Sequence, residues 1–176
     1  MSTDVQLFED RLTIERQLKA SREVVWQYLT DPALRQKWFC AGDMDAHAGG
    51  KMVFAFDHNR ISNSPPPGKT GCSEAITFEG EITTYDPPRE LAFSWPEESG
   101  ADTHVRIRLE EKDGGTQLHL EHSRLAKDEH RSGAAAGWHA HLDLLVDLTN
   151  GDEARDFWLH YEPLEKMYAD KVKAQG

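Results

Sequence analysis

The sequence has no uninterrupted apolar run near the roughly 18 residues that cross a membrane. Residues 1–10 contain three acids and lack a cationic segment followed by an apolar one, so the sequence predicts no secretory signal. Cysteine is also rare: Cys40 and Cys72 are the only two, with no C-x-x-C spacing. In a chain without an export signal, we expect both to be free thiols in a cytoplasmic protein.

Basic residues are scarce as well. Only 20 Lys and Arg stand against 31 Asp and Glu, which gives a formal net charge of −11. A nucleic-acid binder needs a basic surface that neutralises phosphates, and an anionic membrane surface repels an acidic protein. The composition therefore excludes both as expected partners. Hydrophobic residues make up 38% of the chain, which is enough to build a packed core.

Motifs of catalytic and metal sites are missing too. There is no G-x-S-x-G nucleophile motif, and neighbouring acids such as 110–111 fall near predicted turns, where water solvates both side chains. His139 and His141 are two residues apart and diverge on a helix, whereas His119 and His122 face opposite sides of a strand. We therefore expect no metal, no cofactor and no enzymatic activity.

Short segments of alternating apolar and polar residues recur along the first two thirds of the chain. Turn signals at Gly49-Gly50 and 113–115 separate some of them, and the proline-rich stretch 58–74 predicts an irregular loop. We expect about six or seven antiparallel strands from this pattern. The predicted strands are 12–18, 43–47, 51–57, 75–85, 90–95, 104–110 and 116–122.

Two short helices are predicted near the N-terminus, after a loose leader at 1–11. Ser21 has a side chain suited to a helix N-cap and precedes an apolar stripe. Asp31 and Pro32 then end this helix and begin a second one, which we expect to reach Trp38.

The last third of the sequence predicts helices, after an Ala- and Gly-rich linker at 124–136. Apolar residues at three- and four-residue spacing over 138–149 predict a long helix that covers one face of the sheet. A further apolar stripe at 152–173 also needs cover, either on the domain or at a homodimer interface. Pro163 should kink this segment or begin a fresh helix there. The layout predicts an α+β fold.

Several motifs follow one another in an order typical of a known family. They are Val24-Val25-Trp26, Leu29-Thr30-Asp31-Pro32, Leu91-Ala92-Phe93-Ser94-Trp95 and Gly137-Trp138. In these the sequence resembles START-like (SRPBCC) proteins, and among them most closely the activator of heat shock protein 90 ATPase homologue family. The resemblance covers about residues 12–150 and implies a helix-grip fold: a curved antiparallel sheet, a long C-terminal helix over its concave face and a cavity between them. Residues 1–11 are then a leader, and 151–176 a C-terminal helical extension.

The residues that face this cavity are predicted from strand alternation and from the inner stripe of the long helix. They either enclose apolar space or fill it as an ordinary core. His122 shares a strand face with Leu118 and Leu120, so with His141 it is the candidate polar group inside the cavity; the alternative is that it ties strand to helix. The candidates are Phe54, Phe56, Phe78, Phe93, Trp95, Val105, Ile107, Leu118, Leu120, His122, Trp138, His141, Leu142 and Leu145.

Three functions remain open on this basis. The first is binding of a hydrophobic small molecule or lipid in the cavity. The resemblance implies an alternative, a co-chaperone-like protein-interaction module that acts on a heat shock protein 90 homologue, and an acidic surface suits a basic partner. The third is an enzyme that uses the same cavity, for which only His122 and His141, joined at most by Arg16, offer ionisable groups.

Overall fold

One antiparallel sheet and one long helix organise the molecule, which a computed structural model describes for residues 4–66, 75–97 and 101–176. The described strands form a seven-stranded sheet in the order β1-β2-β7-β6-β5-β4-β3. Neighbouring strands in it are antiparallel. The strands are β1 (Asp4–Leu7), β2 (Arg11–Leu18), β3 (Lys51–Phe56), β4 (Ile76–Asp86), β5 (Glu90–Trp95), β6 (Thr103–Lys112) and β7 (Gly115–Ser123).

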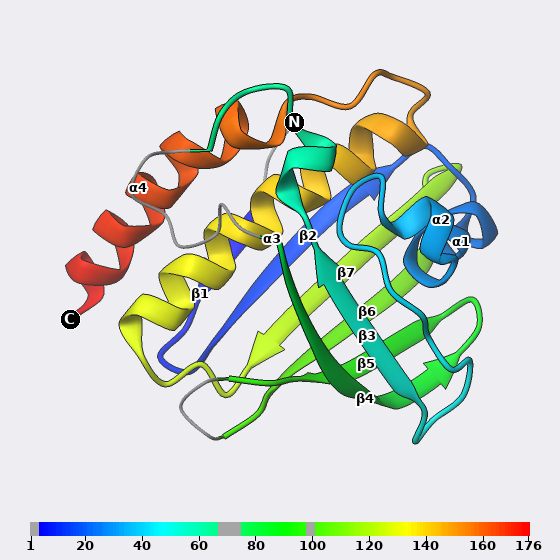
Figure 1. Ribbon diagram of the computed structural model, residues 1–176, viewed down its shortest axis with the longest axis horizontal. Helices are drawn as coiled ribbons and strands as arrows, with labels where there is room; N and C mark the ends of the chain where they lie inside the picture. The colour runs from blue at the N-terminus through cyan, green and yellow to red at the C-terminus, as the bar shows by residue number, and fades with distance from the viewer. Residues whose placement is uncertain (1–3, 67–74, 98–100) are drawn as a thin grey trace.

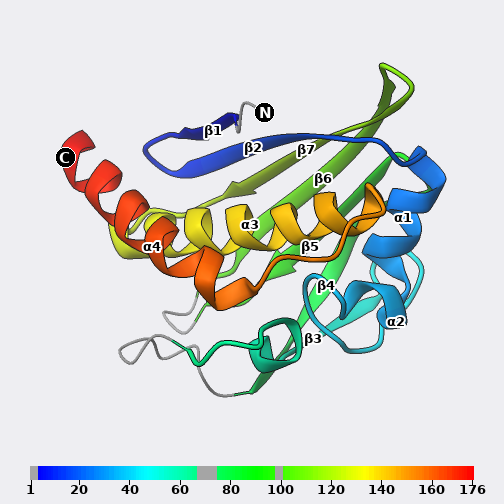
Figure 2. The same cartoon turned by 90° about the horizontal axis from the view of Figure 1, so that it is seen from above.

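The helices lie mainly on the concave side of this sheet. The sheet curves around α3, with β1 and β2 on one side of the helix and β3 on the other (Figure 1, Figure 2). This arrangement confirms the predicted α+β class and helix-grip fold. The helices are α1 (Arg22–Thr30), α2 (Pro32–Arg35), the 3-10 helix η1 (His58–Ile61), α3 (Asp128–Thr149) and α4 (Phe157–Gln175). No described helix is long and apolar enough to cross a membrane.

Alternation along the strands decides which side chains meet α3. In β2, Leu12, Ile14 and Leu18 are fully buried, and the residues between them are partly exposed, apart from Arg16. Arg16 also points to the buried side, and its Nε donates a 2.9 Å hydrogen bond to Asp143 of α3. The concave side of the sheet and α3 therefore share one core.

Three boundaries near the N-terminus differ from the prediction. The expected leader contains β1, because Val5 and Leu7 pair with β2 and pack on the core. The predicted strand at 43–47 is wrong: it holds only an isolated bridge, from Met44. The buried guanidinium of Arg35 donates to the backbone carbonyls of Cys40 and Gly42, so the chain that leads to residue 43 winds around that charge. For the same reason α2 ends at Arg35 rather than at Trp38.

The C-terminal helices also differ from the prediction. The segment 124–136 is mostly helix, because α3 begins at Asp128 and buries Ala135 and Ala136 against the core. Pro163 does not begin a fresh helix, because it lies inside a single helix, α4. Proline has no N–H, so the backbone carbonyl of Leu159, four residues earlier, loses its hydrogen-bond donor. Leu159 is 66% exposed, so water can solvate this carbonyl. In the predicted loop, 58–61 form η1, while 67–74 with Cys72 lie outside the described residues.

The apolar stripe of the last segment is covered within the chain. Helix α4 lies beside the N-terminal half of α3 and runs back along it (Figure 1, Figure 2). Phe157, Tyr161, Leu164 and Tyr168 are buried in this contact. α4 is thus a wall of the same core.

Candidate functional site

A pocket of about 330 Å³ lies between the sheet and the N-terminal half of α3. Strands β3, β4 and β5 supply one wall, and η1 with the beginning of α4 supplies another. Aromatic rings form most of its surface. Its volume is at the small end of the range for ligand pockets.

Six of the predicted cavity residues line this pocket, and eight do not. The eight are at most 2% exposed and belong to the solid core. At these positions the second alternative holds, because the side chains fill the space between the sheet and α3 as an ordinary core. The six that line the pocket are Phe56, Phe78, Trp95, His122, Trp138 and His141. The eight in the core are Phe54, Phe93, Val105, Ile107, Leu118, Leu120, Leu142 and Leu145.

Sequence reasoning missed the pocket residues that come from outside the strands and the inner stripe of α3. Phe39 reaches the pocket from the turn after α2, His58 from η1, and three aromatic residues from the first turns of α4. Only the tertiary arrangement brings these segments together. The three from α4 are Phe157, Trp158 and Tyr161.

Two glycines of α3 help to leave the pocket open. Gly133 and Gly137 are four residues apart on one face of the helix, and both line the pocket. A Cβ added at either position meets no heavy atom within 4 Å. Glycine lowers the stability of a helix relative to alanine. Two glycines on this face leave open the space that larger side chains would occupy.

A directed chain of hydrogen bonds runs through His122 at the inner end of the pocket. The indole Nε1 of Trp138 donates to His122 Nδ1 over 3.0 Å. Nε2 must then carry the proton, and it donates to Oγ1 of Thr103 over 2.7 Å. The Thr103 hydroxyl in turn donates to the carbonyl of Trp95 over 3.2 Å. Every member is satisfied when His122 is neutral.

His141 is held in a similar way but by different partners. Its Nδ1 donates to the Trp38 carbonyl over 2.7 Å, and its Nε2 lies 3.3 Å from Nε2 of His58. His122 and His141 both line the pocket but do not bond each other. His122 ties strand β7 to helix α3 through Trp138, which is the alternative that the sequence left open. Burial lowers the pKa of His122 and of His141 to about 3, so both rings are neutral at ordinary pH.

Arg35 fixes the segment that carries Phe39 into the pocket. Its guanidinium is buried and bonds the backbone carbonyls of Cys40 and Gly42. Phe39 stacks on Trp138, with ring centroids 4.9 Å apart. The neighbouring Cys40 thiol is buried, which raises its pKa to about 12 and makes it a poor nucleophile.

Asp156 ties the segment after η1 to the start of α4. Its carboxylate caps α4 by accepting from the Leu159 amide over 3.2 Å. The same side chain accepts from the amides of Asn63 and Ser64 at 2.7 and 3.0 Å, and from the hydroxyl of Ser62. One carboxylate thus holds two walls of the pocket together.

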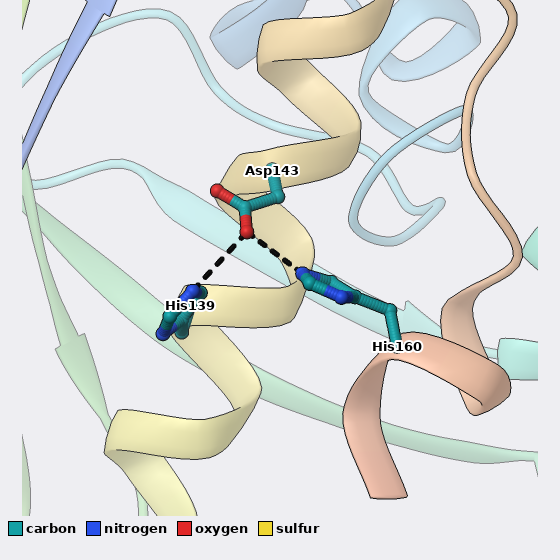
Figure 3. A group of neighbouring side chains, drawn as sticks. All are labelled: His139, Asp143 and His160. Carbon is teal, nitrogen blue, oxygen red and sulfur yellow. Dashed lines mark hydrogen bonds and ion pairs between the residues drawn. The ribbon is translucent and has the colours of Figure 1, made fainter. Parts of the chain in front are cut away.

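A second polar cluster lies between α3 and α4, outside the pocket (Figure 3). Asp143 Oδ2 is 3.2 Å from Nε2 of His139 and 2.7 Å from Nε2 of His160. Burial alone would raise the pKa of Asp143, but hydrogen bonds from both histidines and the charge of Arg16 hold it far below its usual range. His139 and Asp143 are four residues apart and therefore share a face of α3, a signal that is absent from the histidine pairs alone.

The curved sheet, the helix inside it and the aromatic pocket together define a START-like helix-grip protein. Residues 19–150 match the family described as activator of Hsp90 ATPase homolog 1-like protein. The match spans most of the chain, and the protein belongs to that family, as its motifs predict. Among curated proteins, none matches the chain.

Solved structures share the fold over nearly the whole chain. The protein encoded by gene BPP1335 from Bordetella parapertussis is 26% identical, with a TM-score of 0.80 over 96% of this chain and 94% of its own. CalU16 from Micromonospora echinospora is 22% identical, with a TM-score of 0.68 over 99% and 98%. EF2215 from Enterococcus faecalis, a conserved protein of unknown function, is 18% identical, with a TM-score of 0.73 over 99% and 92%. The last two likenesses concern the fold alone.

Proposed function

We propose that this protein binds a hydrophobic small molecule in the pocket between the sheet and α3. The observation that carries the proposal is the open face of α3 at Gly133 and Gly137, opposite a wall of aromatic rings. A helix that needed only a packed core would present larger side chains there. Apolar pockets with a few placed polar groups are typical ligand sites.

The charges around the pocket narrow the class of ligand. None of the described lining residues is a lysine or an arginine. Glu97 and Glu129 line it instead, and Glu129 is exposed and marks the mouth. A free fatty acid would place its carboxylate among these carboxylates or against neutral His122 and His141, without a lysine or an arginine to balance it. The proposed ligand is therefore an uncharged aromatic or alicyclic molecule, or an uncharged lipid.

The same groups support binding rather than catalysis. His122 and His141 are neutral and hydrogen-bonded through both ring nitrogens, so neither is poised to exchange a proton with a substrate. The Cys40 thiol is buried and protonated. We accordingly propose that the pocket holds its ligand without changing it. The cytoplasmic location and a homodimer remain predictions from the sequence.

Occupancy of the pocket tests the proposal directly. Native mass spectrometry of the purified protein should detect a bound small molecule, or else a neutral fluorescent apolar probe should bind and raise the melting temperature. Gly137→Leu places a side chain in the open space, and should abolish both signals in a folded protein. Ser132→Leu, on the same helix outside the pocket, should leave them intact. Equal probe binding by Gly137→Leu and the wild type would refute the pocket as the site.

The family relationship supports a second proposal, a co-chaperone-like role on a heat shock protein 90 homologue. The acidic surface, with a net charge of −11, suits electrostatic attraction to a basic partner surface. The test is the ATPase rate of such a chaperone with and without the full chain, at low and high salt. An unchanged rate at both salt concentrations would eliminate this role and leave the pocket proposal standing.

A further inference from the structure

We propose that His139, Asp143 and His160 form a binding site for a divalent transition-metal ion, with zinc as the best fit. It is the only group of three or more His, Cys, Asp or Glu with this geometry in 4–66, 75–97 and 101–176. The side chains converge from α3 and α4 on one point (Figure 3).

The spacing of the ligand atoms matches a tetrahedral ion. One ring nitrogen of His139, one carboxylate oxygen of Asp143 and one ring nitrogen of His160 all lie within 4.8 Å of one another. Two of the three separations are 3.2 and 2.7 Å. Ligand atoms at zinc–nitrogen and zinc–oxygen bond lengths lie roughly 3.3 Å apart at tetrahedral angles. The cluster needs only small side-chain movements to admit the ion.

Two of the three ligands already have the outer hydrogen bonds that metal ligands use. His139 Nε2 donates to Asp143, so ion binding requires the tautomer with its proton on Nδ1. The Tyr168 hydroxyl, 2.8 Å from Nδ1, can accept that proton and leave the Nε2 lone pair for the ion. Asp143 Oδ1 accepts from Arg16 Nε over 2.9 Å, so this bond orients the carboxylate while Oδ2 faces the histidines.

The exposure of the cluster allows an ion to enter and to keep a water ligand. The side chains of His139 and Asp143 are 10% and 12% exposed, and that of His160 is 23% exposed. Solvent therefore reaches the site from the His160 side. The fourth position of a tetrahedral zinc ion is available to water there.

The local charges tolerate a divalent ion. Arg16 pairs with Asp143, and Arg155 pairs with both carboxylate oxygens of Asp147 and lies 3.8 Å from Asp143 Oδ2. Two positive charges therefore balance two negative ones, and Arg155 must keep to Asp147 when an ion binds Asp143. An ion at this point meets a nearly neutral surrounding, as it does in sites built from three neutral imidazoles. Two nitrogen ligands and one oxygen favour zinc, cobalt or nickel over calcium and magnesium, which prefer oxygen.

Titration of the chelator-treated full chain with zinc chloride tests this site. Calorimetry should detect one bound ion per chain, and cobalt chloride should give the intense visible absorption of a tetrahedral site. His160→Gln removes the most exposed ligand and should weaken zinc binding by at least about 100-fold, whereas Tyr168→Phe should weaken it about 10-fold. His47→Gln, an exposed histidine elsewhere, should bind zinc as the wild type does.

Imidazole NMR keeps the test valid if His160→Gln fails to fold. Zinc should shift the Nε2 resonances of two histidines in the wild-type protein, His139 and His160. No zinc binding, equal affinity in His160→Gln and the wild type, or zinc shifts at other histidines would overturn the proposal. The cluster would then be only a hydrogen-bond network between α3 and α4.

Discussion

The indole of Trp138 donates its N–H to Nδ1 of His122, and this one bond fixes the charge of the histidine. A protonated His122 would present an N–H toward another N–H across 3.0 Å. It would also carry its charge at 2% exposure. Geometry and burial therefore both favour the neutral ring.

This arrangement predicts a loss of stability at mildly acidic pH. The pKa of His122 is about 3 in the folded state and near 6.5 in the unfolded chain. Its contribution is fully present above pH 6.5 and declines as the pH falls towards 3, because only the unfolded chain takes up the proton. The free energy of unfolding should fall by about 1 kcal/mol per pH unit from this residue alone.

The matched measurement is chemical denaturation of wild type and His122→Gln between pH 7.5 and about pH 5. Glutamine does not titrate, so the variant should show the shallower pH dependence, whatever its stability at pH 7.5. Parallel curves for the two proteins would contradict a neutral buried His122.

Strand alternation predicted the fold well, because it reports which side of a strand is buried. It could not report how far along the buried side a cavity extends. Phe54 and Phe56 lie on the same side of β3, yet only Phe56 lines the pocket. The difference arises from where α3 approaches the sheet, and no local pattern encodes that distance.

Local sequence patterns also could not predict contacts between distant segments, because such contacts depend on how the helices pack. His160 meets Asp143 only because α4 folds back on α3. Gly137 appeared in the sequence as part of a family motif, and its role in leaving space became clear only beside the aromatic rings of α4.

Gly133 and Gly137 should lower the free energy of unfolding while leaving space for a ligand in the pocket. Gly133→Ala adds a methyl group in open space on a helix, so the free energy of unfolding should rise by about 0.5–1 kcal/mol. Thermal or urea denaturation measures it. Gly114→Ala is the control: it also meets open space, but its φ of +77° disfavours alanine, so that variant should lose stability. If the free energy of unfolding rose in both variants, or in neither, Gly133 would not be a position where open space alone disfavours glycine.

Cys40 should resist thiol reagents while the protein is folded. Its side chain is buried and its pKa is raised to about 12, so neither access nor the thiolate is available. The measurement uses Cys72→Ser protein, in which Cys40 is the only thiol, with a chromogenic disulfide reagent at pH 8. The colour should develop only on unfolding in denaturant. Rapid reaction of the folded protein would show that this segment opens readily.

Asp156 should be important for both stability and the pocket. Asp156→Ala removes the cap of α4 and the acceptor for the 62–64 segment, so the free energy of unfolding should fall by about 1–2 kcal/mol. Some burial raises the pKa of Asp156, but its hydrogen bonds outweigh this and lower it to about 2. The difference in the free energy of unfolding between wild type and Asp156→Ala should therefore be complete above pH 4 and shrink as the pH falls towards 2.

Urea denaturation of the two proteins across this pH range measures the effect, and Asp152→Ala is the matched control. Asp152 is an exposed acid four residues earlier with only a backbone hydrogen bond, so its removal should cost little at any pH. Because Asp156 joins the η1 segment to α4, its loss should also weaken apolar probe binding, which Asp152→Ala should preserve. Asp156→Ala with unchanged stability and unchanged probe binding would mean that other contacts hold these two walls together. Those contacts include the 3.2 Å hydrogen bond from the Trp158 amide to the Ser62 hydroxyl and the stacking of His58 on Phe157.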